Sequence, residues 1–110
     1  MISIYKEDTD NLFAELSLKE ANMANADLFK AELIVLFDKY HKNVILNIGK
    51  VEYIDSSFLG ALVSALKYGI SVKNDIILVS LQKDIADLFA LIRLDKVFKI
   101  YGSFDDVPNH

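Results

Sequence analysis

The residues whose types and spacing could support chemistry stand together in one short stretch, Asp55-Ser56-Ser57. This carboxylate and these two hydroxyls follow an apolar extended segment and come directly before an amphipathic helix. The first amide N–H groups of a helix have no partner within it, and its aligned peptide dipoles leave a partial positive charge at that end. A hydroxyl there can cap the helix, and a phosphate is accommodated well. The stretch therefore predicts either a simple cap at Ser56 or Ser57, or a site of reversible charge.

Two predicted elements position this stretch. Before it, residues 43–48 are almost continuously apolar, which is typical of a parallel strand buried on both faces. After it, apolar residues recur with the spacing i, i+3, i+4 and i+7, at Leu59, Leu62, Val63 and Leu66. This spacing predicts a helix with one apolar stripe, which runs to about Tyr68 and stops at Gly69, a residue suited to the left-handed conformation.

The segments before the central strand predict a hairpin and a helix. Residues 1–6 and 12–18 are extended by their pattern and flank a polar turn, which predicts an antiparallel pair. Over residues 22–40 the apolar positions follow a helical period. Asn25 is the expected cap of this first helix, and Asp27 is expected in its first turn.

Beyond the second helix, strands and helices alternate again. Residues 75–79 predict a buried strand, Ser80 is expected to open a third helix, and residues 97–100 predict a short final strand. Residues 104–107 are expected to form a last helical turn, and residues 108–110 are expected to fray.

The resulting order of elements, ββαβαβαβ, defines the expected fold class. It predicts one α/β domain over residues 1–110, with a mixed, mostly parallel sheet, an N-terminal antiparallel hairpin and three to four covering helices. A chain of 110 residues is long enough to bury one core and too short for two.

Composition and charge exclude several classes of function. A net charge of −4 and a pI near 5.0 leave no basic patch for nucleic acid or for an anionic membrane, so neither is an expected partner. Cysteine is absent, which excludes a disulfide framework and thiolate chemistry. No segment resembles a signal peptide or an apolar span long enough for a bilayer, which predicts a cytoplasmic protein.

Catalytic and metal-binding motifs are also missing from the sequence. His41 and His110 are the only imidazoles, one in a predicted turn and the other at the terminus, so neither a metal site nor Ser-His catalysis is expected. The sequence contains no phosphate-binding loop, dinucleotide glycine pattern or Gly-x-Ser-x-Gly motif. We therefore expect a binding protein that needs no cofactor, and not an enzyme.

The predicted second helix has a second face that lacks charge. Opposite the first stripe lie further apolar or small residues: Phe58, Ala61, Ala65 and Tyr68. A surface helix normally shows charges on that side, yet Lys67 is the only charged residue of this helix. Either both faces are buried, one against the sheet and one beneath the first helix, or one face is an exposed patch that binds a partner.

Residues 51–62, with the sequence VEYIDSSFLGAL, resemble the signature of the STAS family (sulfate transporter and anti-sigma factor antagonist). In that signature a strand end reads apolar-Asp-Ser-Ser/Thr-Gly-Leu-Gly. Residues 91–100 resemble the family's last helix and strand, and the similarity spans about residues 1–107. Phe58 stands where the family has glycine, and Asn47 stands where an aspartate is common.

The resemblance implies a STAS fold and the function of an anti-sigma factor antagonist. In bacterial members the serine after the aspartate, here Ser56, is phosphorylated by a partner kinase that is itself the anti-sigma factor, and a PP2C-type phosphatase reverses this. ATP and metal would belong to the kinase. By this resemblance Asp55 orients the hydroxyl and Ser57 caps the helix, and the partner is expected to contact Phe58, Leu59, Gly60, Ala61 and Ala65.

Two other functions fit parts of the sequence. The first is a STAS subunit of a larger assembly, such as a stress-sensing scaffold or a lipid transporter component, in which docking to other STAS subunits is constitutive. The second is a response-regulator receiver domain with Asp55 as phosphoacceptor, since this aspartate ends a strand and Ser80 follows a later one. The hairpin predicted in the first 22 residues and the lack of a suitably placed lysine argue against a receiver.

Overall fold

Five strands form one mixed sheet in the computed structural model, which describes residues 1–108. In the order β1-β2-β4-β6-β7, the first two strands pair antiparallel and the other neighbours pair parallel. This confirms the predicted fold class of a mixed, mostly parallel sheet with an N-terminal hairpin. The expected fraying at residues 109–110 and the role expected for His110 lie outside the described residues. The strands are β1 (Ile2–Glu7), β2 (Asn11–Leu16), β4 (Asn43–Asn47), β6 (Ile76–Val79) and β7 (Lys99–Tyr101).

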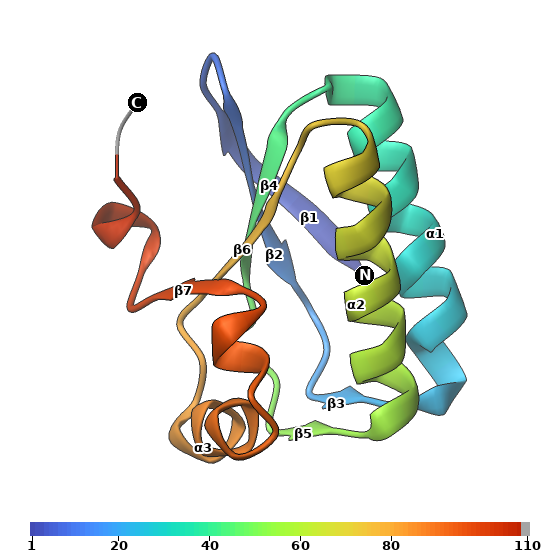
Figure 1. Cartoon of the computed structure of the whole chain (residues 1–110), viewed down its shortest axis with the longest axis vertical. Helices are drawn as coiled ribbons and strands as arrows, with labels where there is room; N and C mark the ends of the chain where they lie inside the picture. The colour runs from blue at the N-terminus through green and yellow to red at the C-terminus, as the bar shows by residue number, and fades with distance from the viewer. Residues whose placement is uncertain (109–110) are drawn as a thin grey trace.

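Three α-helices follow strands of the fold: α1 (Met23–Tyr40), α2 (Ser56–Ser71) and α3 (Lys83–Leu91). α1 and α2 lie side by side along one face of the sheet and start at the same end of the molecule, while α3 packs near that end (Figure 1). Residues 1–108 also contain two short 3-10 turns: η1 (Leu94–Lys96), between α3 and β7, and η2 (Phe104–Asp106), after β7. The second of these confirms the predicted last helical turn.

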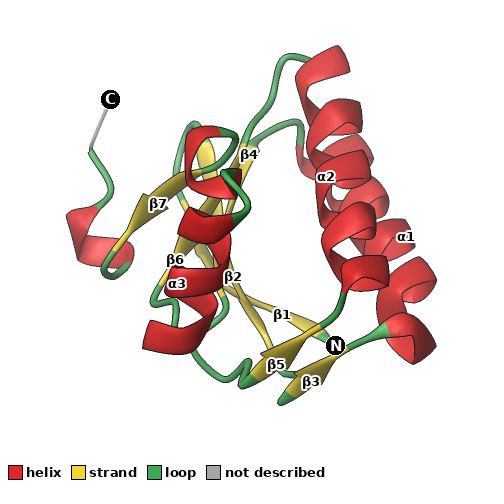
Figure 2. Cartoon of the chain, turned by 60° about the horizontal axis from the view of Figure 1, so that its bottom comes forward, coloured by secondary structure: helices red, strands yellow, loops and turns green. Residues whose placement is uncertain are grey.

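A second, two-stranded sheet was not predicted. β3 (Glu20–Ala21) and β5 (Tyr53–Ile54) pair in parallel, directly before α1 and α2 (Figure 2). Ala21 and Ile54 are register partners and both are buried. This short ladder brings the N-terminal ends of the two helices together, although they are far apart in the sequence.

The start of α1 differs from the prediction. Asn22 is the N-cap, since its backbone is extended and its side chain accepts a hydrogen bond from the N–H of Ala24 at 3.0 Å. Asn25 completes a capping box, because its side chain accepts from the N–H of Asn22 at 3.0 Å. The predicted cap at Asn25 is therefore wrong, and Asp27 lies beyond the first turn.

Two further helix ends also differ. α2 continues past Gly69 because this glycine lies inside the helix against Phe37, and a Cβ there would come within 2.7 Å of the ring. The glycine thus serves close packing and does not stop the helix. α3 begins at Lys83 and not at Ser80. The reason is that Ser80 adopts a left-handed φ of 65° and donates its backbone N–H to the carbonyl of Tyr101 at 3.2 Å.

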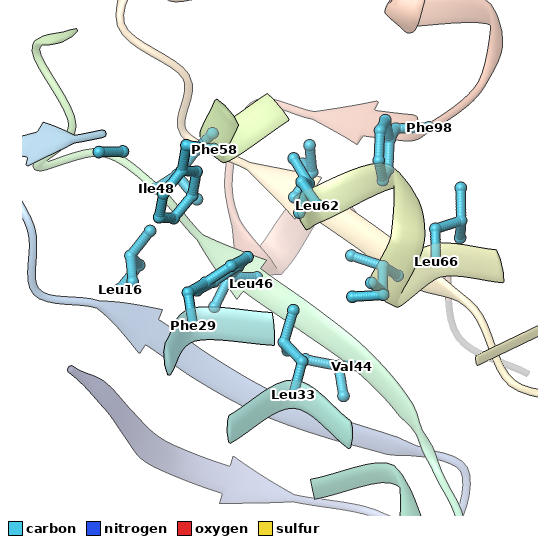
Figure 3. Packing of buried hydrophobic residues seen from close by; sticks show 14 of the residues in the cluster. Leu16, Phe29, Leu33, Val44, Leu46, Ile48, Phe58, Leu62, Leu66 and Phe98 are labelled. Atoms are coloured by element: carbon cyan, nitrogen blue, oxygen red, sulfur yellow. The ribbon is translucent and has the colours of Figure 1, made fainter. Parts of the chain in front are cut away.

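The main core lies between the sheet and the helices. Phe29 of α1 and Phe58 of α2 pack ring to ring, with centroids 4.4 Å apart, and Leu46 of β4 lies beside them (Figure 3). On the opposite face of the sheet, Phe104 and Val107 pack against a smaller cluster that includes Ile45 of β4. β4 is therefore buried on both faces, as its almost continuously apolar sequence predicts.

Candidate functional site

The Asp55-Ser56-Ser57 stretch lies where β5 ends and α2 begins. The backbone N–H of Asp55 donates to the carbonyl of Ala21 at 3.0 Å, so the β3–β5 ladder continues to this residue. Ser56 is the first residue of α2, and both serine side chains are exposed. The prediction that the serines stand at a helix N-terminus is confirmed.

Asp55, and neither serine, is the N-cap of α2. Its backbone is extended (φ −105°, ψ 174°), and its Oδ1 accepts a hydrogen bond from the N–H of Phe58 at 2.9 Å. The predicted serine cap is therefore wrong, because Ser56 and Ser57 already lie within the helix. An aspartate is as good an N-cap as serine, and its charge adds a favourable interaction with the helix dipole.

The second oxygen of the same carboxylate reaches the neighbouring helix. Oδ2 of Asp55 accepts from the backbone N–H of Met23, the first residue of α1, at 2.9 Å. The first turns of α1 and α2 contain no acidic residue of their own. Asp55 therefore supplies negative charge to the positive ends of two helices at once.

The engagement of both oxygens changes the role expected for Asp55. Within residues 1–108, neither oxygen makes a hydrogen bond to the hydroxyl of Ser56. In this structure Asp55 organises the backbone beneath the serine and does not orient its hydroxyl.

Two backbone donors at this helix end have no protein partner. Across the described residues, no acceptor takes the N–H groups of Ser56 and Ser57, whereas Phe58 and Leu59 donate to the side chain and carbonyl of Asp55. These two amides sit beside an exposed hydroxyl at the positive end of α2. These two N–H groups are therefore available as hydrogen-bond donors to an anionic group on Ser56.

The expected partner contacts divide into buried and accessible residues. Phe58 and Ala65 are only 1% and 0% exposed, because they face α1 and the sheet, so the structure removes them from the expected contact surface. Leu59 and Ala61 are half-buried, and Gly60 is exposed. Each predicted stripe of α2 contributes two buried residues, Leu62 and Leu66 from the first and Phe58 and Ala65 from the second. The other members, Leu59, Val63, Ala61 and Tyr68, are half-buried and pack against the same core, so neither stripe is a fully exposed apolar face.

The two departures from the family signature have local structural roles. The ring of Phe58 points into the core against Phe29, so it does not cover the serines. Asn47 ends β4, and its Oδ1 accepts from the N–H of Gly49 at 2.8 Å, which shapes the turn toward β5.

Met23 is the residue at this site that the sequence pattern did not indicate. It is 75% exposed and contacts Asp55 through its backbone, so no side-chain signal marks it. The only available signal was the Asn22-x-x-Asn25 capping box, which places Met23 at the first position of α1.

Other candidate sites add no chemistry to this picture. His41 ends α1 in the left-handed conformation, with φ 54°, and its side chain is exposed. In the part of the chain that the structure describes, no three His, Asp or Glu side chains are grouped so that they could hold a metal ion. None of the helices within residues 1–108 is both long and apolar enough to span a bilayer.

Comparisons with known proteins agree with this arrangement. The STAS domain family model matches residues 19–107. A relative named as an anti-sigma factor antagonist, from Thermotoga neapolitana, is 35% identical over 89 residues, which is 80% of this chain and 79% of the relative. A crystal structure of an anti-sigma factor antagonist from Thermotoga maritima superposes with a TM-score of 0.73 at 32% identity, covering 84% of this chain and 81% of that one.

A more distant likeness concerns the fold alone. The Bacillus cell fate determinant SpoIIAA, solved in its phosphorylated form, superposes with a TM-score of 0.68 at 13% identity, covering 96% of this chain and 95% of that chain. The family model covers most of the sequence and includes the whole serine site. The chain therefore belongs to the STAS domain family, and its relatives are of the anti-sigma factor antagonist type.

Proposed function

We propose that this protein is an anti-sigma factor antagonist that switches between protein partners by reversible phosphorylation of Ser56. The observation that carries the proposal is the exposed Ser56 at the start of α2, beside two backbone N–H groups without a protein acceptor. The family and the names of the relatives support the role of an anti-sigma factor antagonist. The protein binds and regulates, and it catalyses no reaction itself.

The switch works through charge. Phosphorylation adds about −1.5 to −2 charge and three acceptor oxygens at neutral pH. A partner that buries the neutral serine must desolvate this charge or supply a cation, and without a cation the complex dissociates. α2 accommodates the phosphate where it stands, because the Ser56 and Ser57 amides offer donors at a positive helix end. Binding is therefore released without refolding.

The partners are an anti-sigma factor with serine kinase activity and a PP2C-type phosphatase. The phosphorylated form of SpoIIAA, whose fold is similar to this one, supports a modified state of such a fold. The kinase brings the ATP and the metal. Ser56, Leu59, Gly60 and Ala61 form the partner-binding surface.

A phosphoaspartate at Asp55, as in a receiver domain, is not favoured. Both of its oxygens accept backbone N–H groups, at 2.9 Å each, and phosphorylation would convert one of these oxygens into the bridging oxygen of an acyl phosphate and remove the negative charge of the carboxylate that caps the helix. The first strands form an antiparallel hairpin, which a receiver lacks. An acid-stable, base-labile phosphate identifies phosphoserine and excludes phosphoaspartate.

The phosphorylation test compares two neighbouring serines. The chain, Ser56→Ala and Ser57→Ala are incubated with the cognate kinase and ATP, and the peptides are mapped by mass spectrometry. We expect phosphate on the wild type and on Ser57→Ala, and none on Ser56→Ala, which still binds the kinase. Phosphate on Ser57 with Ser56 free would refute the switch as placed here. Binding without phosphorylation of either serine would favour a constitutive subunit of a larger assembly.

Gly60 offers a separate probe of the partner surface. A Cβ built at this exposed position meets no atom within 4 Å, so Gly60→Gln leaves the fold intact. We expect this substitution to lower kinase affinity by about tenfold or more, because a bulky side chain then stands in the interface. Unchanged affinity would place the partner elsewhere on the molecule.

A further inference from the structure

The carboxylate of Asp55 joins the first turns of α1 and α2, and we infer that it transmits the charge state of Ser56 to the first residue of α1. This inference rests on the proposed modification of Ser56. In the unmodified chain Oδ1 accepts from the N–H of Phe58 and Oδ2 from the N–H of Met23, both at 2.9 Å. Phosphorylation weakens the bond to Met23 and leaves the bond to Phe58, so Asp55 acts as a positioning residue.

The cause is the proximity of two anions. A phosphate on Ser56 stands on the residue next to Asp55, and like charges at such short range are little screened by salt. The phosphate also brings strong acceptor oxygens to the amides at the start of α2. The phosphate then provides a second negative charge at the start of α2. It repels the Asp55 carboxylate and favours its displacement.

The two hydrogen bonds of Asp55 differ in how easily water replaces them. The bond to Phe58 lies within one helical turn, and the buried ring of Phe58 fixes that backbone. The bond to Met23 joins residues that are 32 positions apart in the sequence, and Met23 is 75% exposed. Water therefore reaches the Met23 amide readily and can serve as its acceptor. The hydrogen bond between Asp55 and Met23, which joins the two helices, is therefore the one that breaks.

The rest of the α1 start has independent support. The N–H of Ala24 donates to the side chain of Asn22, and the side chain of Asn25 donates to the carbonyl of Glu20 at 3.1 Å. Neither bond involves Asp55. The helix therefore stays folded, and the change is confined to Met23, an exposed residue whose backbone N–H lies against Asp55 and which a partner can contact.

The test installs phosphoserine at position 56 during translation, so that no kinase is needed. The amide proton shift and hydrogen-exchange rate of Met23 are then measured by NMR on the full chain. We expect exchange at Met23 to become faster by about tenfold, and exchange at Phe58 to change by less than about twofold, since one charged hydrogen bond is lost and the other is kept. An unchanged Met23 amide overturns the inference.

Two control proteins make the test specific. Phosphoserine at Ser71, exposed at the opposite end of α2, leaves Met23 unaltered, and an equal effect from that position overturns the inference. In Asp55→Asn the exchange at Met23 is already fast, and phosphoserine at position 56 adds less than about twofold. A larger addition in this variant also overturns it. Because the phosphoserine is installed during translation and no kinase is used, failure of the proposed function appears separately, as partner binding that phosphoserine at position 56 does not weaken.

Discussion

The two ends of the α1–α2 pair are joined in opposite ways. At the N-terminal end, one carboxylate links Met23 and Phe58 through backbone hydrogen bonds at an accessible surface. Toward the C-terminal end, the ring of Phe37 packs directly beneath Gly69, where a Cβ would come within 2.7 Å of it. The contact at the N-terminal end depends on the charge of Asp55. The contact at the C-terminal end depends on how the Phe37 ring fills the space beneath Gly69.

This difference explains how one end can serve as a switch. Buried packing responds steeply to changes in shape but not to a charge that arrives at the surface. A partly exposed hydrogen bond to a carboxylate responds to a new anion beside it. α1 and α2 therefore stay together at the Phe37 end while the Asp55 end adjusts.

The largest effect is expected from emptying the packed end. Phe37 is 1% exposed, and Phe37→Ala should lower the free energy of unfolding by about 3–5 kcal/mol, through lost burial and the cavity left beneath Gly69. The matched control is Val35→Ala, on the same helix and 60% exposed, with an expected change of less than about 0.5 kcal/mol. Urea unfolding followed by circular dichroism measures both. Equal losses in the two variants would contradict the assignment of this end to packing.

A smaller effect is expected at the polar end. Asp55→Ala removes the cap of α2 and the acceptor for Met23, and should lower the free energy of unfolding by about 0.5–2 kcal/mol. Ser57→Ala, two residues further along, should change it by less than about 0.5 kcal/mol, because Ser57 is not the cap. The same unfolding measurement compares them. If Ser57→Ala lowered the free energy of unfolding as much as Asp55→Ala does, Ser57 and not Asp55 would be the effective N-cap.

The smallest effect concerns the exposed hydrogen bond at the packed end. The hydroxyl of Tyr68 donates to Asp38, and this bond raises the pKa of Tyr68 above its ordinary value of 10.0. The bond needs the protonated phenol, so its contribution is complete at neutral pH and is lost as the pH rises through the raised pKa. An alkaline titration by ultraviolet absorbance should show one late-titrating tyrosine that is missing in Tyr68→Phe. In Asp38→Asn this tyrosine should titrate closer to its ordinary value, and an unaltered titration there would exclude Asp38 as the cause.

Local pattern was sufficient for the parts of the fold in which neighbours in sequence decide the outcome. The almost continuously apolar run at 43–48 predicted a strand buried on both faces, and the apolar residues of β4 are buried in this way. The helical spacing after Ser57 predicted α2, and the polar turn between two extended segments predicted the β1–β2 hairpin. These elements follow from side-chain periodicity and turn chemistry, which act over a few residues.

The ends of the helices were harder to predict, because several residues compete for each role. Asn22 and Asn25 can both cap α1, and Asp55 and Ser57 can both cap α2. Gly69 looked like a helix stop, yet the approach of Phe37 explains why a glycine is needed there. In each case a contact from elsewhere in the chain, or one residue of difference in backbone geometry, decided between equal candidates.

The sequence by itself determined that an aspartate and two serines stand at the start of an amphipathic helix. Only the tertiary structure decided what each of them does. The β3–β5 ladder sets the starts of α1 and α2 side by side, and this places the amide of Met23 within reach of Asp55. The ladder is two residue pairs long, so it leaves no periodic signal, and a backbone donor leaves no side-chain signal. For these physical reasons the shared carboxylate became visible only in the folded chain.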